Sequence, residues 1–412
     1  MPETFRPETE DQLLDAVKWA VLEKTPMEVI AGGTKRHFGR PMQTAGTLDL
    51  SAMAGVMTYE PAELFVTAKA GTPMAELTAT LDEKGQQFSF EPPDLGPLLG
   101  SGVDKGTIGG IVATNLAGPR RIKEGAARDH VLGFHAVSGR GEVFKSGGTV
   151  VKNVTGFDLS KLMAGSFGTL AVMSHVTLKV LPQPEKIRTL LVGWRADGVY
   201  DHGAMKAMSK ALGSSHDVSG AAHLPAVAAG TSAVDYVSES GGGVTALRLE
   251  GPGPSVEHRA QALTDEIKDF GRIEELHTTN SKTFWREVRD VRPFVGRDDL
   301  PYVWRISVPP ADGSRIALFI LESLKGEVFY DWGGGQIWLA LAPVVNAGAE
   351  VIRAAVAEAG GHATLVRAPA DIRGEVPVMQ PQSDAEAGLT KNIKEGFDPE
   401  GVLNPGRMYP GV

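Results

Sequence analysis

The hydrophobic pattern at the start of the chain predicts a helix followed by a strand. Leu13, Leu14 and Val17 share one face of a helix, and Thr9 fits its N-cap. The apolar run 27–30 then fits a short buried strand. Because β/α arrangements bind ligands at the carboxyl ends of their strands, we expect the loop after residue 30 to be functional.

A long strand and a linker close the first part of the chain. Leu170, Val172 and Val176 alternate with polar residues that include His175, so we expect His175 on the solvent side of this strand. The sequence LPQPEK at 181–186 follows. Its two prolines cannot continue a strand ladder, which indicates a domain boundary.

The pattern changes beyond the linker. Residues 303–368 follow the order strand, helix, strand, strand, helix, strand, which is ferredoxin-like. Residues 189–277 show a weaker copy, so we predict one broad antiparallel sheet backed by helices. We therefore predict an α+β protein with a first domain over 1–184, a second domain over 185–385, and a tail over 386–412 that returns to the first domain.

The loop AGGTKRHFGR at 31–40 combines two adjacent glycines with a hydroxyl and several cations. Glycine lets the main chain approach a ligand and direct several N–H groups at one anion, which makes a phosphate the first candidate ligand. The same residues also fit an ordinary polar turn with a double glycine. The loop alone leaves both interpretations open.

The composition describes an ordinary globular protein that is rich in glycine. The chain has 412 residues, 42% of them hydrophobic, and many of its 50 glycines lie between residues 96 and 168 among apolar residues. A net charge of −9 disfavours a nucleic-acid partner. The absence of cysteine excludes disulfides, iron–sulfur ligation and a thiol nucleophile, and it favours the cytoplasm. No apolar run is long enough to cross a membrane.

Familiar nucleotide and zinc motifs do not fit. The dipeptide Gly-Lys occurs nowhere, which excludes a P-loop. Gly100 and Gly102, with the next glycine at Gly106, lack the strand and helix context of a dinucleotide fold. His130 and His135 lie at or near a predicted strand and should face opposite ways, so we predict no metal site from them.

The order of the glycine-rich segments resembles a known flavoprotein family. IAGGTKRHFG is followed by PPD at 92–94, GTIGGIVATNLAGPRR, GAARDHVLGFHAVSGRGEVFKSGG and VKNVTGFDLSKLMAGSFGTLAV, and the tail contains FDPEGVLNPGRM. Together they resemble the FAD-binding domain of the vanillyl-alcohol oxidase and p-cresol methylhydroxylase (PCMH) family, over residues 1 to about 184 and 396–408. ATNLAGPRR, VKNVTGFDLSKLMAGS and VWRISVPP look most like the FAD-binding subunits of glycolate oxidases.

The resemblance implies a PCMH-type FAD-binding domain of two α/β subdomains. The main-chain N–H groups of residues 32–36 would surround the FAD pyrophosphate, while Lys35 or Arg36 offsets its charge. The implied cofactor-binding residues are Gly32, Gly33, Thr34, Lys35, Arg36, Asp94, Thr107, Gly109, Gly110, Ala113, Thr114, Asn115, Gly118 and Leu170. Lys152 and Arg128 fit solvated surface cations at least as well as flavin contacts.

The resemblance also implies that FAD is bound non-covalently. Family members that tether FAD usually carry histidine where this chain has Thr34, or a cysteine further on, and this chain has no cysteine. His37 lies three residues later and is not expected to form a tether.

The resemblance further implies an oxidoreductase that acts on CH–OH groups. A small 2-hydroxy acid such as glycolate or D-lactate needs a cation for its carboxylate, and Arg305 is the candidate catalytic residue, with Arg286 and Arg289 as other available cations. Related dehydrogenases carry a histidine-rich metal cluster in the second domain. The corresponding stretch here, YDWGGGQIWLAL, contains no histidine.

Three functions therefore remain open. The first is the FAD-binding subunit of a glycolate oxidase complex that works with a catalytic flavoprotein subunit and an iron–sulfur subunit. The second is a free-standing FAD-dependent 2-hydroxy acid dehydrogenase of the D-lactate type. The third is a non-catalytic scaffold that keeps the flavin fold. In each case we expect a cytoplasmic protein without direct membrane insertion, which reaches the inner membrane only through partners.

Overall fold

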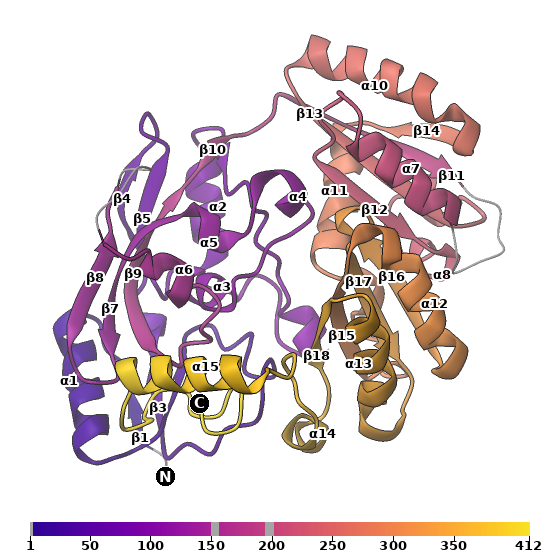
Figure 1. Ribbon diagram of the computed structural model, residues 1–412. Helices are drawn as coiled ribbons and strands as arrows, with labels where there is room; N and C mark the ends of the chain where they lie inside the picture. The colour runs from indigo at the N-terminus through magenta and orange to yellow at the C-terminus, as the bar shows by residue number, and fades with distance from the viewer. Residues whose placement is uncertain (1–2, 150–155, 194–201) are drawn as a thin grey trace. The chain divides into compact units, whose positions relative to one another are not determined.

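The computed structural model describes residues 3–149, 156–193 and 202–412 (Figure 1). Lys152 and most of the segment VKNVTG lie outside these residues. The chain divides into two compact units. The first unit contains Met1–Ala117, Gly125–Gln183 and Pro377–Val412, and the second contains Gly118–Glu124 and Pro184–Val376.

The unit boundaries add two details to the sequence pattern. The chain passes from the first unit to the second at Pro184, inside the proline-containing segment 181–186. The returning tail begins at Pro377, earlier than residue 386. The short segment Gly118–Glu124 groups with the second unit, which the sequence pattern did not indicate.

The first unit contains two main sheets. A three-stranded parallel sheet has the order β1-β3-β2, and a five-stranded antiparallel sheet has the order β4-β5-β9-β7-β8. The elements are β1 (Glu3–Phe5), α1 (Glu10–Leu22), β2 (Met27–Ile30), β3 (Gly46–Asp49), β4 (Val56–Glu60), β5 (Phe65–Lys69), α2 (Met74–Asp82), β6 (Gln86–Gln87), α3 (Ile108–Thr114), α5 (Ala127–His130), β7 (Val131–Ser138), β8 (Val143–Gly147), α6 (Leu159–Met163), β9 (Ala171–Lys179), β10 (Leu181–Pro182) and α15 (Asp384–Phe397).

The C-terminal tail completes the edge of the parallel sheet at β2. The amide of Met27 donates to the carbonyl oxygen of Val402 at 2.8 Å, and the amide of Asn404 donates back to the carbonyl oxygen of Met27 at 3.0 Å. Leu403 is fully buried in the same core as Leu13 and Met27. The tail therefore fixes the strand that leads into the glycine loop, because it pairs with that strand and shares its core.

The second unit is built on one eight-stranded antiparallel sheet, as predicted, with the order β14-β11-β13-β12-β16-β17-β15-β18. The elements are α4 (Arg121–Glu124), β11 (Lys186–Gly193), α7 (His202–Leu212), β12 (Gly220–Leu224), α8 (Ala226–Ala229), α9 (Asp235–Ser238), β13 (Val244–Gly251), α10 (Gly253–Ile267), β14 (Arg272–Leu276), α11 (Thr278–Arg289), β15 (Tyr302–Ser307), α12 (Gly313–Ser323), β16 (Gly326–Asp331), β17 (Gln336–Leu341), α13 (Ala349–Glu358), β18 (His362–Arg367) and α14 (Ala370–Glu375).

This sheet consists of two ferredoxin-like halves. Numbered within each half, the strand order is 4-1-3-2 in the first half and 2-3-1-4 in the second. The halves join where β12 pairs with β16, at His223 and Tyr330. The weaker copy over 189–277 is thus confirmed as a second ferredoxin-like unit, and its poorly defined strand is β12.

The two faces of the second half-sheet differ in chemistry. Trp304 on β15 lies on the face covered by α13, because its indole donates to the carbonyl oxygen of Ala347 and Arg353 stacks on its ring. Side chains alternate along a strand, so Arg305 points to the opposite face. The cross-strand partners of Arg305 and Ser307 share that face, and they include Thr364, Gln336 and His362.

Candidate functional site

The glycine loop follows β2 in the first unit and needs small residues for two different reasons. Gly33 has a φ of 69°, a left-handed conformation that glycine adopts without strain. At Gly32 a Cβ atom would lie 1.8 Å from the carbonyl oxygen of Lys105, so the main chains approach too closely for a side chain. The loop is therefore held in one shape by its neighbours.

This shape leaves a row of main-chain donors available. Among the residues that the structure describes, the amides of Gly32, Gly33, Thr34 and Lys35 have no protein acceptor. All four residues line one pocket. Consecutive amides without protein acceptors, at the end of a strand, form a binding site for an anion such as a phosphate.

Lys35 adds a buried positive charge to the same place. Its residue is 8% exposed, and within the described residues the only acceptor for its ammonium is the hydroxyl of Thr34, at 3.3 Å. Burial lowers the pKa of Lys35 to about 8, Asp94 opposes that shift, and the charge of Arg407 adds to it. A buried ammonium with so few acceptors is stabilised by an anionic ligand.

Arg36 differs from Lys35 because it has a carboxylate partner. Its guanidinium donates to Glu28 from Nε at 2.9 Å and from Nη2, and this pairing raises the pKa of Arg36. The side chain is also 52% exposed. Lys35 therefore supplies the uncompensated charge that the sequence assigned to either residue.

Helix α3 forms another wall of the pocket. Thr107 caps the helix, and its hydroxyl accepts from the amide of Gly110 at 3.4 Å. Gly109 packs against the residue that follows β5, since a Cβ atom there would lie 2.7 Å from the carbonyl oxygen of Ala70. A Cβ atom on Gly110 would point towards the Lys35 ammonium, 3.6 Å away. Small residues thus let the helix approach both the sheet and the ligand.

Two tail residues, which the sequence did not indicate, complete the pocket. Arg407 donates to the carbonyl oxygen of Lys35 at 2.7 Å. Asn404 accepts from the amide of Val29 at 2.8 Å and donates to the carbonyl oxygen of Phe167 at 2.8 Å. Both residues line the pocket. They join the tail, the strand before the loop and the turn before β9.

The pocket holds about 700 Å³ of space, including its open mouth. It brings together ten of the predicted cofactor-binding residues: Gly32, Gly33, Thr34, Lys35, Arg36, Thr107, Gly109, Gly110, Ala113 and Thr114. Its lining otherwise comes from Val29, Ile30, Ala31, Leu50, Ala70, Phe167, Gly168, Ala171, Val172, Met173, Asn404 and Arg407.

Four predicted cofactor residues do not line this pocket. Asp94 accepts from the amides of Gly96 and Asp104. Asn115 ends α3 and accepts from the amide of Arg128 at 2.9 Å, and Leu170 is buried. Gly118 belongs to the second unit, where its carbonyl oxygen accepts from the Trp332 indole at 3.2 Å. His37, the alternative tether, does not line the pocket either and has Nδ1 3.1 Å from the carbonyl oxygen of Leu99.

Arg305 lies in the second unit, on the polar face of the sheet. Among the described residues its guanidinium has no hydrogen-bond acceptor and no carboxylate partner. Burial lowers the pKa of Arg305 to about 10, and the charge of Arg121 contributes. Arg121 itself stacks on Trp332, 4.4 Å from the ring centre. These two guanidinium groups can bind an anion such as a carboxylate.

The segment that carries Arg121 is anchored within the second unit. Arg120 forms a buried ion pair with Glu250, with contacts of 2.5 and 2.9 Å. Burial alone would raise the pKa of Glu250, but Arg248 and Arg120 outweigh it and lower the pKa to about 2. Lys123 pairs with Asp217 at 2.6 Å. The segment Gly118–Glu124 is therefore a strap held by ion pairs at Arg120 and Lys123.

His362 provides an imidazole near these arginines. His362 is exposed at the start of β18, and partial desolvation lowers its pKa, as do the charges of Arg305, Arg121 and Arg353. A neutral imidazole can accept a proton, and the neighbouring positive charges make this one a weaker base. The sequence did not indicate this histidine, because it lies outside the stretch 330–341. In the sheet, His362 on β18 lies opposite Ser307 on β15.

Comparison with known proteins gives the context of this site. A family model described as an FAD binding domain matches residues 3–147. Glycolate oxidase subunit GlcE from Escherichia coli K12 is 33% identical over 399 residues, which cover 96% of each chain. The chain belongs to the GlcE family of FAD-binding proteins. A D-lactate dehydrogenase from Anaerostipes hadrus is 34% identical over 145 residues, which cover 35% of this chain and 29% of that one.

Solved structures confirm the PCMH-type fold. 4-Ethylphenol oxidase from Gulosibacter chungangensis has a TM-score of 0.71 at 15% identity, with 99% of this chain and 89% of that chain covered. p-Cresol methylhydroxylase has a TM-score of 0.67 at 15% identity, with coverages of 99% and 88%. The α+β fold expected from the sequence is therefore confirmed, and the family's cofactor is FAD.

The described pocket fits FAD. Four available amides and the buried Lys35 ammonium suit a pyrophosphate, and small residues on α3 leave room for it.

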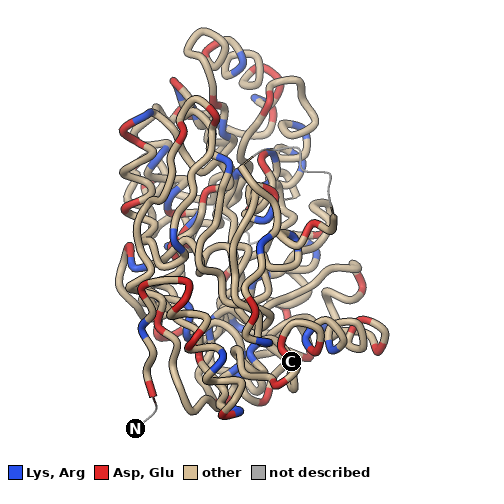
Figure 2. The backbone as a smooth tube through the Cα atoms, turned by 90° about the vertical axis from the view of Figure 1, so that its left-hand side faces the viewer, with Lys and Arg blue, Asp and Glu red and all other residues tan. Residues whose placement is uncertain are grey.

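Basic and acidic residues are interspersed along the chain in the view of Figure 2. Across the described residues, no helix is both long and apolar enough to span a bilayer.

Proposed function

We propose that this chain is the FAD-binding subunit of a glycolate oxidase complex and takes part in the oxidation of glycolate to glyoxylate. The observation that carries this proposal is the similarity to GlcE over 96% of both chains. Glycolate oxidase subunit GlcD from Bacillus subtilis is also related, at 29% identity over 46% of this chain. The partners would be a catalytic flavoprotein subunit and an iron–sulfur subunit.

The FAD would be held without a covalent bond. Gly32, Gly33, Thr34 and Lys35 would bind its pyrophosphate through their amides, and the Lys35 ammonium would neutralise one negative charge. Thr34 offers no nucleophile of the kind that tethers flavin in this family, and His37 does not line the pocket. Bound FAD supplies the two-electron acceptor for oxidation of a CH–OH group.

The residues of this chain that would handle a 2-hydroxy acid lie on the polar face of the second unit. Arg305 would bind the substrate carboxylate, because its guanidinium lacks a carboxylate partner among the described residues and Arg121 adds a second positive charge. Binding at this pair orients the acid by one end and leaves its hydroxyl free to face an acceptor.

His362 favours a second candidate function, a free-standing 2-hydroxy acid dehydrogenase. Its imidazole lies near Arg305 and could take the hydroxyl proton without a metal ion. The stretch 330–341 contains no histidine where related dehydrogenases carry a metal cluster, and His362 supplies an imidazole from elsewhere in the second unit. The scaffold alternative has no support of this kind.

Turnover distinguishes the two candidates. The purified chain would be assayed with glycolate and with D-lactate and an artificial electron acceptor, alone and after co-expression with a metal-containing flavoprotein subunit and an iron–sulfur subunit. The subunit proposal predicts that turnover is barely measurable alone and appears in the complex. Fast turnover by the isolated chain, lost in His362→Gln, would favour the free-standing dehydrogenase.

The cytoplasmic location, with membrane contact only through partners, stays a prediction. Fractionation of the co-expressing cells tests it.

A further inference from the structure

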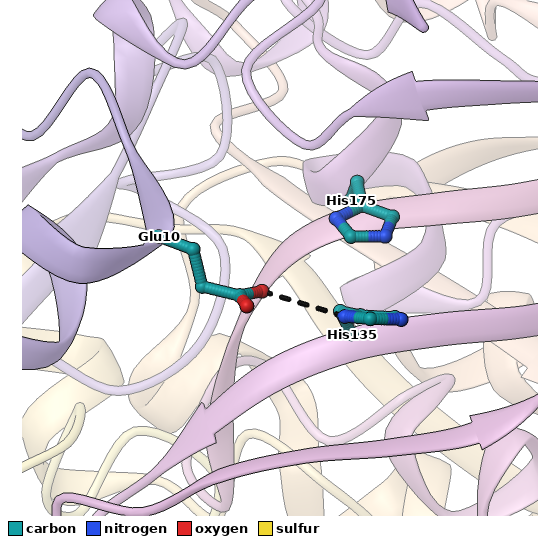
Figure 3. A group of neighbouring side chains, drawn as sticks. All are labelled: Glu10, His135 and His175. Carbon is teal, nitrogen blue, oxygen red and sulfur yellow. Dashed lines mark ion pairs between the residues drawn. The ribbon is translucent and has the colours of Figure 1, made fainter. Parts of the chain in front are cut away.

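Two histidines and a glutamate meet in the first unit away from the FAD pocket (Figure 3). His135 on β7 and His175 on β9 lie directly opposite each other across the two strands. Glu10, the first residue of α1, points towards them. One ligand atom from each residue lies within 4.8 Å of the others, and none of the three residues lines the pocket.

The local structure of the sheet creates this cluster. The pairing of β7 and β9 shifts register between His135 and Ala136, which places Ser174 at an irregularity. The Ser174 hydroxyl donates to Glu10 Oε2 at 2.5 Å, and this oxygen lies 3.6 Å from His135 Nδ1. His175 is partly exposed, as expected for the solvent side of β9, and its ring stacks on that of His135 with 4.1 Å between centres.

The cluster is accessible to an ion from solution. The carboxylate of Glu10 is 31% exposed and the imidazole of His135 is 36% exposed, so an ion can reach the cluster and both side chains can adjust.

We propose that Glu10, His135 and His175 form a binding site for a divalent transition-metal ion of the Zn²⁺ class. Two imidazoles and one carboxylate are ligands that suit Zn²⁺, Cu²⁺ or Ni²⁺ better than Mg²⁺ or Ca²⁺. Tetrahedral zinc separates its ligand atoms by about 3.3 Å, so the side chains close in by up to about 1.5 Å and the stacked rings open. Water fills the fourth position.

Neighbouring charges set the strength of this site. Lys69 on β5 lies opposite His175, and Lys145 on β8 lies opposite His135. These lysines would weaken the binding of a cation, and Glu10 is the carboxylate that offsets them. Ser174 fixes Glu10 through its hydrogen bond, as outer-shell partners do in metal sites. A metal at this position would tie the start of α1 to the five-stranded sheet.

Calorimetry on the full chain tests the proposal. The FAD-loaded protein would be stripped of metal with a chelator and titrated with Zn²⁺, beside the variants His135→Asn, His175→Asn and Glu10→Gln. His258→Asn is the matched control, because His258 is exposed on α10 in the other unit. FAD content would report folding in every variant. Co²⁺ would serve as a spectroscopic probe of imidazole ligation.

We expect one Zn²⁺ per chain in the wild type and in the control, and at least about tenfold weaker binding in each of the three variants. Zn²⁺ would also raise Tm in the wild type but not in His175→Asn. Equal binding by the wild type and His135→Asn, or no binding beyond weak surface association, would overturn the proposal and leave the cluster a stacked histidine pair bonded to Glu10. FAD content tests the proposed function separately, so the two can fail independently.

Discussion

The two candidate sites of this molecule use different parts of the polypeptide. The FAD pocket in the first unit presents main-chain amides from four consecutive residues, with one buried ammonium at Lys35. The polar face in the second unit presents side chains from separate elements, with Arg305 on β15, His362 on β18 and Arg121 on the strap. One site depends on backbone shape and the other on side-chain placement.

This difference determines what a substitution does in each place. Backbone donors cannot be removed by changing a side chain, but a side chain can occupy the space they need. Side-chain donors can be removed singly without altering the fold. A substitution that changes the shape of the FAD pocket should therefore abolish FAD binding almost completely. A single substitution on the polar face should reduce substrate binding only in part.

The largest effect is expected at Gly32. Gly32→Val should abolish FAD binding, because even a Cβ atom would lie 1.8 Å from the Lys105 carbonyl oxygen and the loop would have to move. Gly388→Ala is the matched control, since nothing lies within 4 Å of its Cβ position. Flavin absorbance per chain after purification measures the effect. Full FAD content in Gly32→Val would show that loop shape is not essential.

The next largest effect is expected at Arg305. Arg305→Ala should raise KM for a 2-hydroxy acid by about 10- to 150-fold, since a charge-assisted hydrogen bond contributes about 1.5–3 kcal/mol. Arg305→Lys should recover part of the loss, and Arg286→Ala on the exposed side of α11 should change little. Steady-state kinetics on the active form of the enzyme measure these values. An unchanged KM would remove Arg305 from substrate binding.

Lys35 should give a pH-dependent effect. Its pKa of about 8 without FAD lies below the usual 10.5, and an anionic ligand would raise it again. FAD should therefore bind most tightly below about pH 8 and more weakly as the pH rises through that value. Lys35→Met should weaken binding by about tenfold or more and flatten this profile. Fluorescence titration with FAD from pH 6 to pH 10 checks it, and a steep profile in the variant would assign the titration elsewhere.

The smallest effect is expected at Arg36. Its guanidinium already pairs with Glu28 and is half exposed, so Arg36→Met should change FAD affinity by less than about threefold. The same titration measures it. A loss as large as that of Lys35→Met would break the distinction between the two cations.

The sequence was sufficient to predict those parts of the molecule that are formed by residues adjacent in sequence. The order of strands and helices after the linker was sufficient for both ferredoxin-like halves, because each element is continuous. The glycine loop was a candidate anion site for the same reason, since its glycines, hydroxyl and cations are adjacent in sequence. Asn404 and Arg407 were missed because the tail reaches the pocket from the far end of the chain. Arg305 was singled out, but nothing near it in sequence pointed to His362.

The histidine cluster shows the same limit. Alternation along a single strand placed His175 towards solvent, and it cannot reveal which residue lies opposite on the next strand. The pairing of His175 with His135, next to a register shift, depends on tertiary structure. The third residue, Glu10, belongs to α1, which is far from both strands in the sequence. Such a cluster is found only when the sheet and the helix are placed together.

The central claim is that this chain holds one FAD without a covalent bond in the pocket of the first unit. The most direct test is to purify the full chain, precipitate it with acid, and measure FAD in the supernatant and in the pellet. We predict about one intact FAD per chain in the supernatant for the wild type and none bound in Gly32→Val. Flavin that stays with the pellet, or a wild-type chain that carries no flavin even after incubation with FAD, would contradict the account.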